Sequence, residues 1–102
     1  MRRVQWTHAA QQDYLEILGY IAQDNPAAAE RVQDRFDEAV LNLARMPTGR
    51  LSRVTGVYEK VVSGLPYIIA YEVRAAAGDP SDLVVLRIIH GARDWPEGGW
   101  PG

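Results

Sequence analysis

Apolar residues recur at helical spacing in the first half of the chain and at strand spacing in the second half. Val4 and Trp6 alternate with polar neighbours, which predicts a short strand over 4–7. Thr7 then stands where a helix N-cap is expected, because its hydroxyl can accept a free backbone N–H. An apolar stripe follows at Ala10, Tyr14, Ile17, Leu18 and Ile21. We therefore expect an amphipathic helix over roughly 9–23.

A second helical stripe begins directly after the first. Asn25 is expected to cap it, and Pro26 suits the first helical position because its missing N–H has no helical partner there. The stripe runs as far as Met46-Pro47 and consists of Ala29, Val32, Phe36, Ala39, Val40 and Leu43. Because the link between the two helices is so short, we predict that they pack as an antiparallel hairpin.

Beyond the Pro47-Thr48-Gly49 turn the period of the pattern changes to two. Three runs, 57–62, 67–73 and 83–89, are predicted to be the strands of an antiparallel meander. In the last run the alternation places Val84, Leu86 and Ile88 on one face, and Leu83, Val85, Arg87 and Ile89 on the other.

The single charge in that last run is informative. We expect Arg87 to mark the face that the helices leave uncovered, where Ile68, Ala70, Glu72 and Lys60 would lie beside it. The predicted class is thus α+β, with a short N-terminal strand, a helical hairpin and a three-stranded antiparallel meander.

Length and composition limit the kinds of function. The chain has 102 residues and 47% hydrophobic positions, without a run of 18 apolar residues or a signal-like start. We expect one domain over 1–96 with a short tail over 97–102, located in the cytoplasm and without a membrane partner. There is no cysteine, and His8 and His90 are the two histidines, so we expect no metal site and no cofactor.

Charge argues against a nucleic-acid-binding protein. Eleven basic and thirteen acidic residues give a net charge of −2, and the two halves of the sequence are similarly balanced. Lys60 is the single lysine, and the arginines are spread along the sequence. Because holding a polyanion requires clustered cations, we do not expect tight direct binding of nucleic acid.

Several short motifs, taken in order, carry a family resemblance. They are Ala10 with Asp13, Asn25-Pro26 with Ala28 and Ala29, the Pro47-Thr48-Gly49-Arg50 turn, the YIIAY strand at 67–71, and LRIIHGARDW at 86–95. Together they resemble the ParE/RelE superfamily of toxins from bacterial type II toxin–antitoxin modules, among them plasmid-stabilisation toxins. The resemblance covers nearly the whole chain and implies the same α+β fold.

The superfamily contains two activities. RelE-like members are ribosome-dependent mRNA endoribonucleases, and their tyrosine strand resembles Tyr-Arg-x-x-Tyr, whereas this chain has Ile68 at the arginine position. An apolar side chain there cannot stabilise the added charge of a phosphorane. ParE-like members, whose pattern includes the HGARDW ending, poison DNA gyrase through protein contacts. The resemblance therefore implies a gyrase inhibitor without catalytic residues, with Arg87, His90, Arg93 and Trp95 as target-binding residues.

The resemblance also implies a cognate ParD-like antitoxin. We expect it to bury an amphipathic helix and an extended segment against the helical hairpin and an exposed sheet edge, either the strand at 57–62 or the first strand.

Other interpretations remain open. A RelE-like nuclease would need Lys60, Glu72, Arg87 and Arg93 to converge. The chain could also be a toxin fold that has lost its toxicity, or a structural domain without partners. In purely structural terms, His90 would cap a turn, Arg93 and Asp94 would form a local ion pair, and Trp95 would plug the core.

Overall fold

The computed structural model describes residues 1–74 and 81–91. In chain order its elements are β1 (Arg3–Trp6), α1 (His8–Asp24), α2 (Pro26–Arg45), β2 (Arg50–Leu51), β3 (Tyr58–Val61), β4 (Tyr67–Arg74) and β5 (Asp82–His90). The α+β class, both helices and the four expected strands are confirmed. β2 was not predicted, since two residues give no period from which a strand can be recognised.

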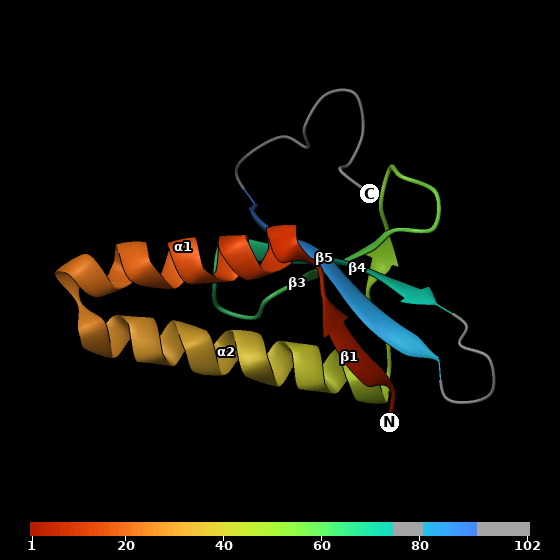
Figure 1. Cartoon of the computed structure of the whole chain (residues 1–102), viewed down its shortest axis with the longest axis horizontal. Coiled ribbons are helices and arrows are strands. Elements are labelled where there is room, and N and C mark those ends of the chain that lie inside the picture. Colours follow the sequence, from red (N-terminus) through yellow and green to blue (C-terminus); the bar gives the residue numbers. More distant parts are fainter. Residues whose placement is uncertain (75–80, 92–102) are drawn as a thin grey trace.

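Both helices begin at the caps that the sequence indicates. The hydroxyl oxygen of Thr7 accepts a hydrogen bond from the Ala10 N–H at 3.1 Å, and α1 starts at His8, directly after Thr7. The side-chain oxygen of Asn25 accepts from the Ala28 N–H at 3.1 Å, with Pro26 as the first residue of α2. Asn25 alone separates the helices, which fold back on each other as the predicted hairpin (Figure 1).

The five strands form one mixed sheet in the order β1-β5-β4-β3-β2. The meander of β3, β4 and β5 is antiparallel as predicted, whereas β1 pairs with β5 in parallel, with Arg3 opposite Asp82. β5 is therefore an inner strand although it comes last in the sequence. Its long apolar run is explained by burial of both faces, because its side chains contribute to two separate buried clusters.

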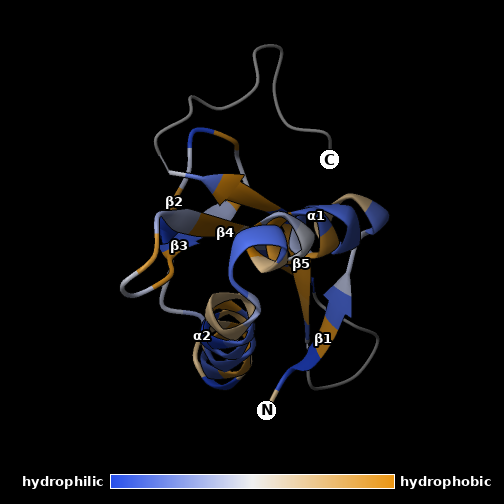
Figure 2. Ribbon diagram, turned by 90° about the vertical axis from the view of Figure 1, so that its left-hand side faces the viewer, coloured by the Kyte–Doolittle hydropathy of each residue, from blue (hydrophilic) through white to orange (hydrophobic). Residues whose placement is uncertain are grey.

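The main core lies between the helices and one face of the sheet. Phe36, Tyr71, Ile69 and Leu43 are almost completely buried there. A chain of ring contacts crosses this core from Trp6 to Tyr14, Phe36 and Tyr67, with centroids 5.3, 5.9 and 5.5 Å apart. Figure 2 shows hydrophobic segments in the strands, and helices in which hydrophobic and hydrophilic residues both occur, as in amphipathic helices.

A bulge in β5 reverses the side-chain pattern that alternation predicts. Ala70 lies opposite Arg87 and Tyr71 lies opposite Val85, so Leu86 is an extra residue in β5. The predicted faces were consequently wrong for four residues. Leu83 and Val85 pack beneath the helices, whereas Val84 and Leu86 belong to a second apolar cluster with Val57 and Ala70.

The expected position of Lys60 was also wrong. Lys60 lies opposite Ile69, which belongs to the core beneath the helices, and Glu59 takes the place opposite Ala70. A difference of one residue in register moves every side chain of a strand to the other face. Ile68 and Glu72 lie opposite Ile89 and Val84, away from the helices as expected.

The turn before β2 depends on a glycine. The Gly49 N–H donates to the Tyr71 hydroxyl at 2.7 Å, and a Cβ atom at Gly49 would overlap the Tyr71 side chain and the carbonyl of Glu59. Burial raises the pKa of the Tyr71 hydroxyl. The Pro47-Thr48-Gly49 turn therefore places β2 against β3 by letting the backbone approach an aromatic side chain closely.

Candidate functional site

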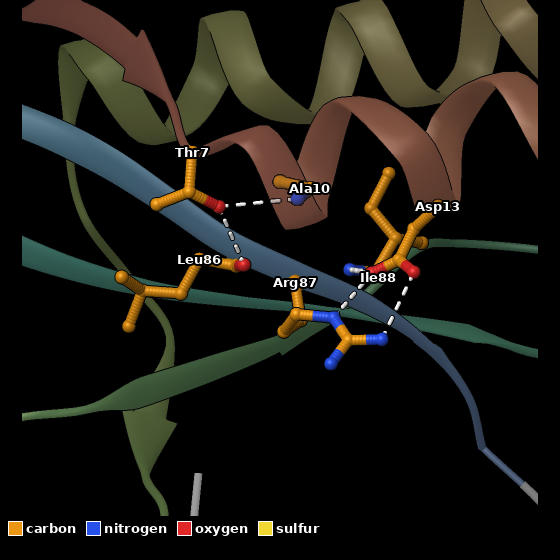
Figure 3. Close-up of polar contacts among 6 residues, drawn as sticks. All are labelled: Thr7, Ala10, Asp13, Leu86, Arg87 and Ile88. Carbon is orange, nitrogen blue, oxygen red and sulfur yellow. Dashed lines mark hydrogen bonds and ion pairs between the residues drawn. The ribbon is translucent and has the colours of Figure 1, made fainter. Parts of the chain in front are cut away.

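The edge of β5 beyond β1 is closed by the beginning of α1. β1 ends at Trp6, so the later residues of β5 need other partners on this side. The Thr7 hydroxyl donates to the Leu86 carbonyl at 2.8 Å, and the Asp13 carboxylate accepts from the Ile88 N–H at 3.0 Å (Figure 3). The side chain of the N-cap residue and one side chain of α1 thus satisfy the strand edge.

Asp13 also holds Arg87. Its two carboxylate oxygens accept from Nε and one terminal nitrogen of the guanidinium at 2.7 and 3.0 Å (Figure 3). The side chains of Arg87 and Asp13 are 29% and 13% exposed. The hydrogen bond to Asp13 raises the pKa of Arg87, while burial acts in the opposite direction. This bidentate pair links α1 to β5. It also engages two nitrogens of the Arg87 guanidinium within the protein.

A signal for this contact exists in the sequence. Asp13 lies three residues after Ala10 and four before Ile17, so it falls within the apolar stripe of the first helix. Arg87 is likewise the one charge in an apolar strand. A carboxylate and a guanidinium that are each directed towards apolar surroundings are expected to pair, because burying either one alone is costly.

The predicted target-binding residues do not gather on one face of β5. Arg87 lies opposite Ala70, on the side of the second cluster, whereas His90 lies opposite Tyr67, which packs against the core beneath the helices. The rings of Tyr67 and His90 meet edge to face, with centroids 5.5 Å apart. Arg93 and Trp95 lie outside the described residues, as do Asp94 and the 97–102 segment.

The set that a nuclease would need is likewise dispersed. Lys60 lies on the helix-covered face and donates to the Thr48 hydroxyl at 3.0 Å. Glu72 lies on the opposite face and is paired with Arg74, while Arg87 is bound to Asp13. Within the described part of the chain, these three side chains therefore do not form a common phosphate-binding group.

The opposite edge of the sheet is open at Val61. β2 pairs with Tyr58 and Glu59 and reaches no further along β3. The Val62 N–H donates to the Tyr67 carbonyl at 2.9 Å, so Val62 turns its backbone towards β4. Backbone direction alternates along a strand, and Val61 therefore points its N–H and C=O outward. Its side chain is 53% exposed.

A groove of about 550 Å³ runs between this edge and α2. Arg35, Glu38 and Asn42 line it from the helix, and Lys60, Val61 and Ser63 from the strand side. One terminal nitrogen of Arg35 donates to the Ser63 carbonyl at 2.8 Å, which ties the helix to the end of β3. The floor is apolar, with Ala39, Leu43 and Val62, and the rim is polar. Such a groove beside an open strand edge can accept an extended peptide.

Two other features are absent from residues 1–74 and 81–91. No group of three His, Cys, Asp or Glu side chains in these ranges is placed to hold a metal ion. No helix in the same ranges is long and apolar enough to cross a membrane.

Comparison with known proteins first defines the class of protein. The fold superposes with a TM-score of 0.76 on a chain of the chromosomal ParDE toxin–antitoxin system from P. aeruginosa, covering 88% of this chain and 96% of that one at 23% identity. The model of the family described as ParE toxin of type II toxin-antitoxin system, parDE, matches residues 4–95. The chain therefore belongs to the ParE toxin family.

Two curated relatives are similar over almost their whole length. The putative toxin Y4kP of Sinorhizobium fredii is 36% identical over 97 residues, which are 94% of this chain and 95% of that protein. Toxin RelE2 of Caulobacter vibrioides is 36% identical over 94 residues, covering 91% and 99%. The chain is thus a ParE-type toxin of a toxin–antitoxin system, and one of these two relatives carries the RelE name.

Proposed function

We propose that this toxin inhibits DNA gyrase by direct protein contact and is neutralised by a ParD-like antitoxin. The observation that carries the proposal is the position of Arg87. It is the one cation in the last strand, and both carboxylate oxygens of Asp13 bind it. A cation used in this way fastens the fold and has little capacity to stabilise charge on a substrate.

The face beside Arg87 also lacks what mRNA cleavage requires. Ile68 and Ala70 lie on this face. Ile68 stands at the position where the tyrosine strand of RelE-like nucleases has an arginine. Removal of one donor to a transition-state anion commonly costs about 10²–10³ in rate. The likeness to toxin RelE2 keeps ribosome-dependent cleavage as the second candidate function.

We further propose that the residues following β5 contact the target. Arg93 and Trp95 follow within five residues of His90, the last residue of the strand. Arg93→Ala and Trp95→Ala should reduce toxicity while leaving antitoxin binding intact, and Arg31→Ala on the exposed side of α2 is the matched control. Full toxicity of both variants would make the C-terminal cluster structural. In the same proposal the toxin domain extends over 1–96, and removal of 97–102 leaves it folded.

The antitoxin is proposed to bind at the open edge. Its extended segment would pair with the outward backbone of Val61, and its apolar side chains would enter the groove between β3 and α2. Two cations, Arg35 and Lys60, line the groove against one carboxylate, Glu38, so a segment with acidic side chains is favoured.

Expression in bacterial cells tests the proposed activity. The gyrase proposal places the toxin in the cytoplasm. It predicts filamentation and a DNA damage response, with translation continuing early after induction. Co-expression of the neighbouring antitoxin gene should restore growth. Prompt cleavage of mRNA within codons, without a change in supercoiling, would favour the nuclease instead. Growth unaffected by the toxin alone would favour a fold that has lost its toxicity.

A further inference from the structure

The fold separates charges that are mixed along the sequence. The two helices carry seven acidic and three basic residues, whereas the other described residues carry three acidic and seven basic ones. The hairpin tip and the far end of the sheet are opposite ends of the molecule (Figure 1). The helical hairpin is therefore net acidic and the rest of the described chain net basic, although the two halves of the sequence are each nearly balanced.

Arginines collect at the end opposite the hairpin tip. Four segments lie at this end, spread across the sheet from one edge to the other: the start of β1, the last turn of α2, β2 with the loop after it, and the end of β4 (Figure 1). Met46 and Leu51 on these segments are 67% and 70% exposed. We call this surface the basic end. It comprises these two residues with Arg2, Arg3, Arg45, Arg50, Arg53 and Arg74.

Carboxylates beneath the basic end orient some of its guanidinium groups. Arg50 donates through Nε to Glu59 at 3.0 Å, and its side chain is 71% exposed while that of Glu59 is 10% exposed. Arg3 stands over Asp82 in the same way, with exposures of 69% and 12%. A guanidinium has five N–H donors, so the outer ones remain available to an acceptor from outside.

Other arginines of the basic end are not neutralised in this way. Arg45 and Arg53 are exposed, and neither forms an ion pair within the described ranges. Arg45 lies in the last turn of α2, where a cation is stabilised by the helix dipole. The surface thus combines oriented donors, free cations and exposed apolar side chains.

We propose that the basic end binds an acidic, partly apolar face of the toxin's protein target. This rests on the proposed function, namely that toxicity is exerted through a protein partner. Arginine and methionine are enriched where protein interfaces exclude water. Met46 and Leu51 would supply the apolar contact, and the arginines around them would meet carboxylates.

A protein fits this surface better than nucleic acid does. Three of the arginines already have carboxylate partners, so fewer cations remain to neutralise phosphates. The acidic helices would also repel a polyanion that extended beyond the basic end. Against an acidic protein face of limited size, the same charge separation instead orients the approaching toxin and speeds association.

Charge reversal tests the proposal with a matched control. Arg53→Glu and Arg45→Glu change the basic end, and Arg31→Glu makes the same change in charge on the exposed side of α2. We would measure growth arrest on induction, binding to purified gyrase at low and physiological salt, and antitoxin binding with a melting curve as checks on folding. We expect the basic-end variants to lose toxicity and to bind the target about tenfold more weakly or worse, with Arg31→Glu close to wild type.

Each other outcome is decisive. Equal toxicity and equal target binding for all three variants would overturn the proposal. Tight binding of a short duplex DNA by the wild type, abolished by the same two reversals, would assign the basic end to nucleic acid. A toxic wild type that does not bind gyrase would remove the gyrase proposal, while the toxicity of the three variants would still decide the role of the basic end. A non-toxic wild type would contradict both.

Discussion

Polar side chains serve different purposes beside the part of β5 that extends beyond β1 and beside the open edge of β3. At the β5 edge, Thr7 and Asp13 satisfy the backbone that β1 leaves unpaired, and Asp13 also fixes Arg87. At the β3 edge, Lys60 and Arg35 bond to nearby oxygens, yet the backbone of Val61 points outward with no strand beside it. The backbone, rather than the charge of the nearby side chains, therefore distinguishes a closed edge from one that can accept a partner.

The largest effect is expected from the core that supports both edges. Phe36 is completely buried and contacts Tyr14 towards the closed edge and Tyr67 on β4. Phe36→Ala should lower the free energy of unfolding by about 3–5 kcal/mol, from a total of about 5–15 kcal/mol for such a domain. Urea unfolding measures this, with Leu41→Ala at a partly exposed position as control. An unchanged stability would show that the core is misassigned.

Substitutions at the closed edge, the part of β5 that Thr7 and Asp13 border, should have the second-largest effect on stability. Asp13→Ala leaves Arg87 without its partner and the Ile88 N–H without an acceptor, and we expect a loss of about 2–3 kcal/mol. Asp13→Asn keeps an acceptor for the N–H but removes the charge, so it should cost about half as much. Unfolding curves, combined with amide exchange at Ile88, measure both effects. The structural role of Arg87 would be refuted if both variants were as stable as wild type while toxicity disappeared.

The open edge should respond in binding rather than in stability. Val61→Pro removes an N–H that faces outward, so the pairing of β3 with β4 persists while strand addition is blocked. Antitoxin affinity should fall about tenfold, or about 1.4 kcal/mol, with toxicity retained. Val61→Ala shortens the same side chain and keeps the N–H, and it should bind nearly as well as wild type. Equal binding by the proline and alanine variants would place the antitoxin elsewhere.

The smallest effect concerns a contact between the two helices of the hairpin. The Tyr14 hydroxyl donates to Asp37 at 2.9 Å. Burial, then this hydrogen bond, raises the pKa of Tyr14 to about 12 from an ordinary value of 10.0. Because the folded-state pKa lies above the unfolded one, the contribution is fully present below pH 10.0 and is lost as the pH rises towards about 12. Tyr14→Phe should flatten the fall in stability over this range, measured by unfolding at alkaline pH. An equally steep fall in the variant would show that Tyr14 does not contribute.

The local features of the fold could be predicted from the sequence because they depend on neighbours in the chain. The caps at Thr7 and Asn25 and the stripe around Phe36 follow from spacing and hydrogen-bonding capacity over a few residues. The bulge at Leu86 could not be predicted in this way, since it is defined by the register of β5 against β4. A single extra residue then reversed the faces of the strand before it.

The candidate site was predictable only in part for the same reason. Asp13 and Arg87 each stand out as a charge within an apolar pattern, but their contact joins residues 74 positions apart. The separation of charge between the helices and the sheet also depends on which segments meet in space. β2 is too short to show a period, although the glycine that places it could be recognised as part of a turn.

An in vitro comparison on one preparation of the toxin tests the central claim most directly. Purified toxin is titrated into a supercoiling reaction with DNA gyrase and into a cell-free translation reaction, each with and without the antitoxin. The account predicts that supercoiling falls while translation continues and mRNA stays intact, and that the antitoxin reverses the effect. Cleavage of mRNA on the ribosome with supercoiling unchanged would contradict it.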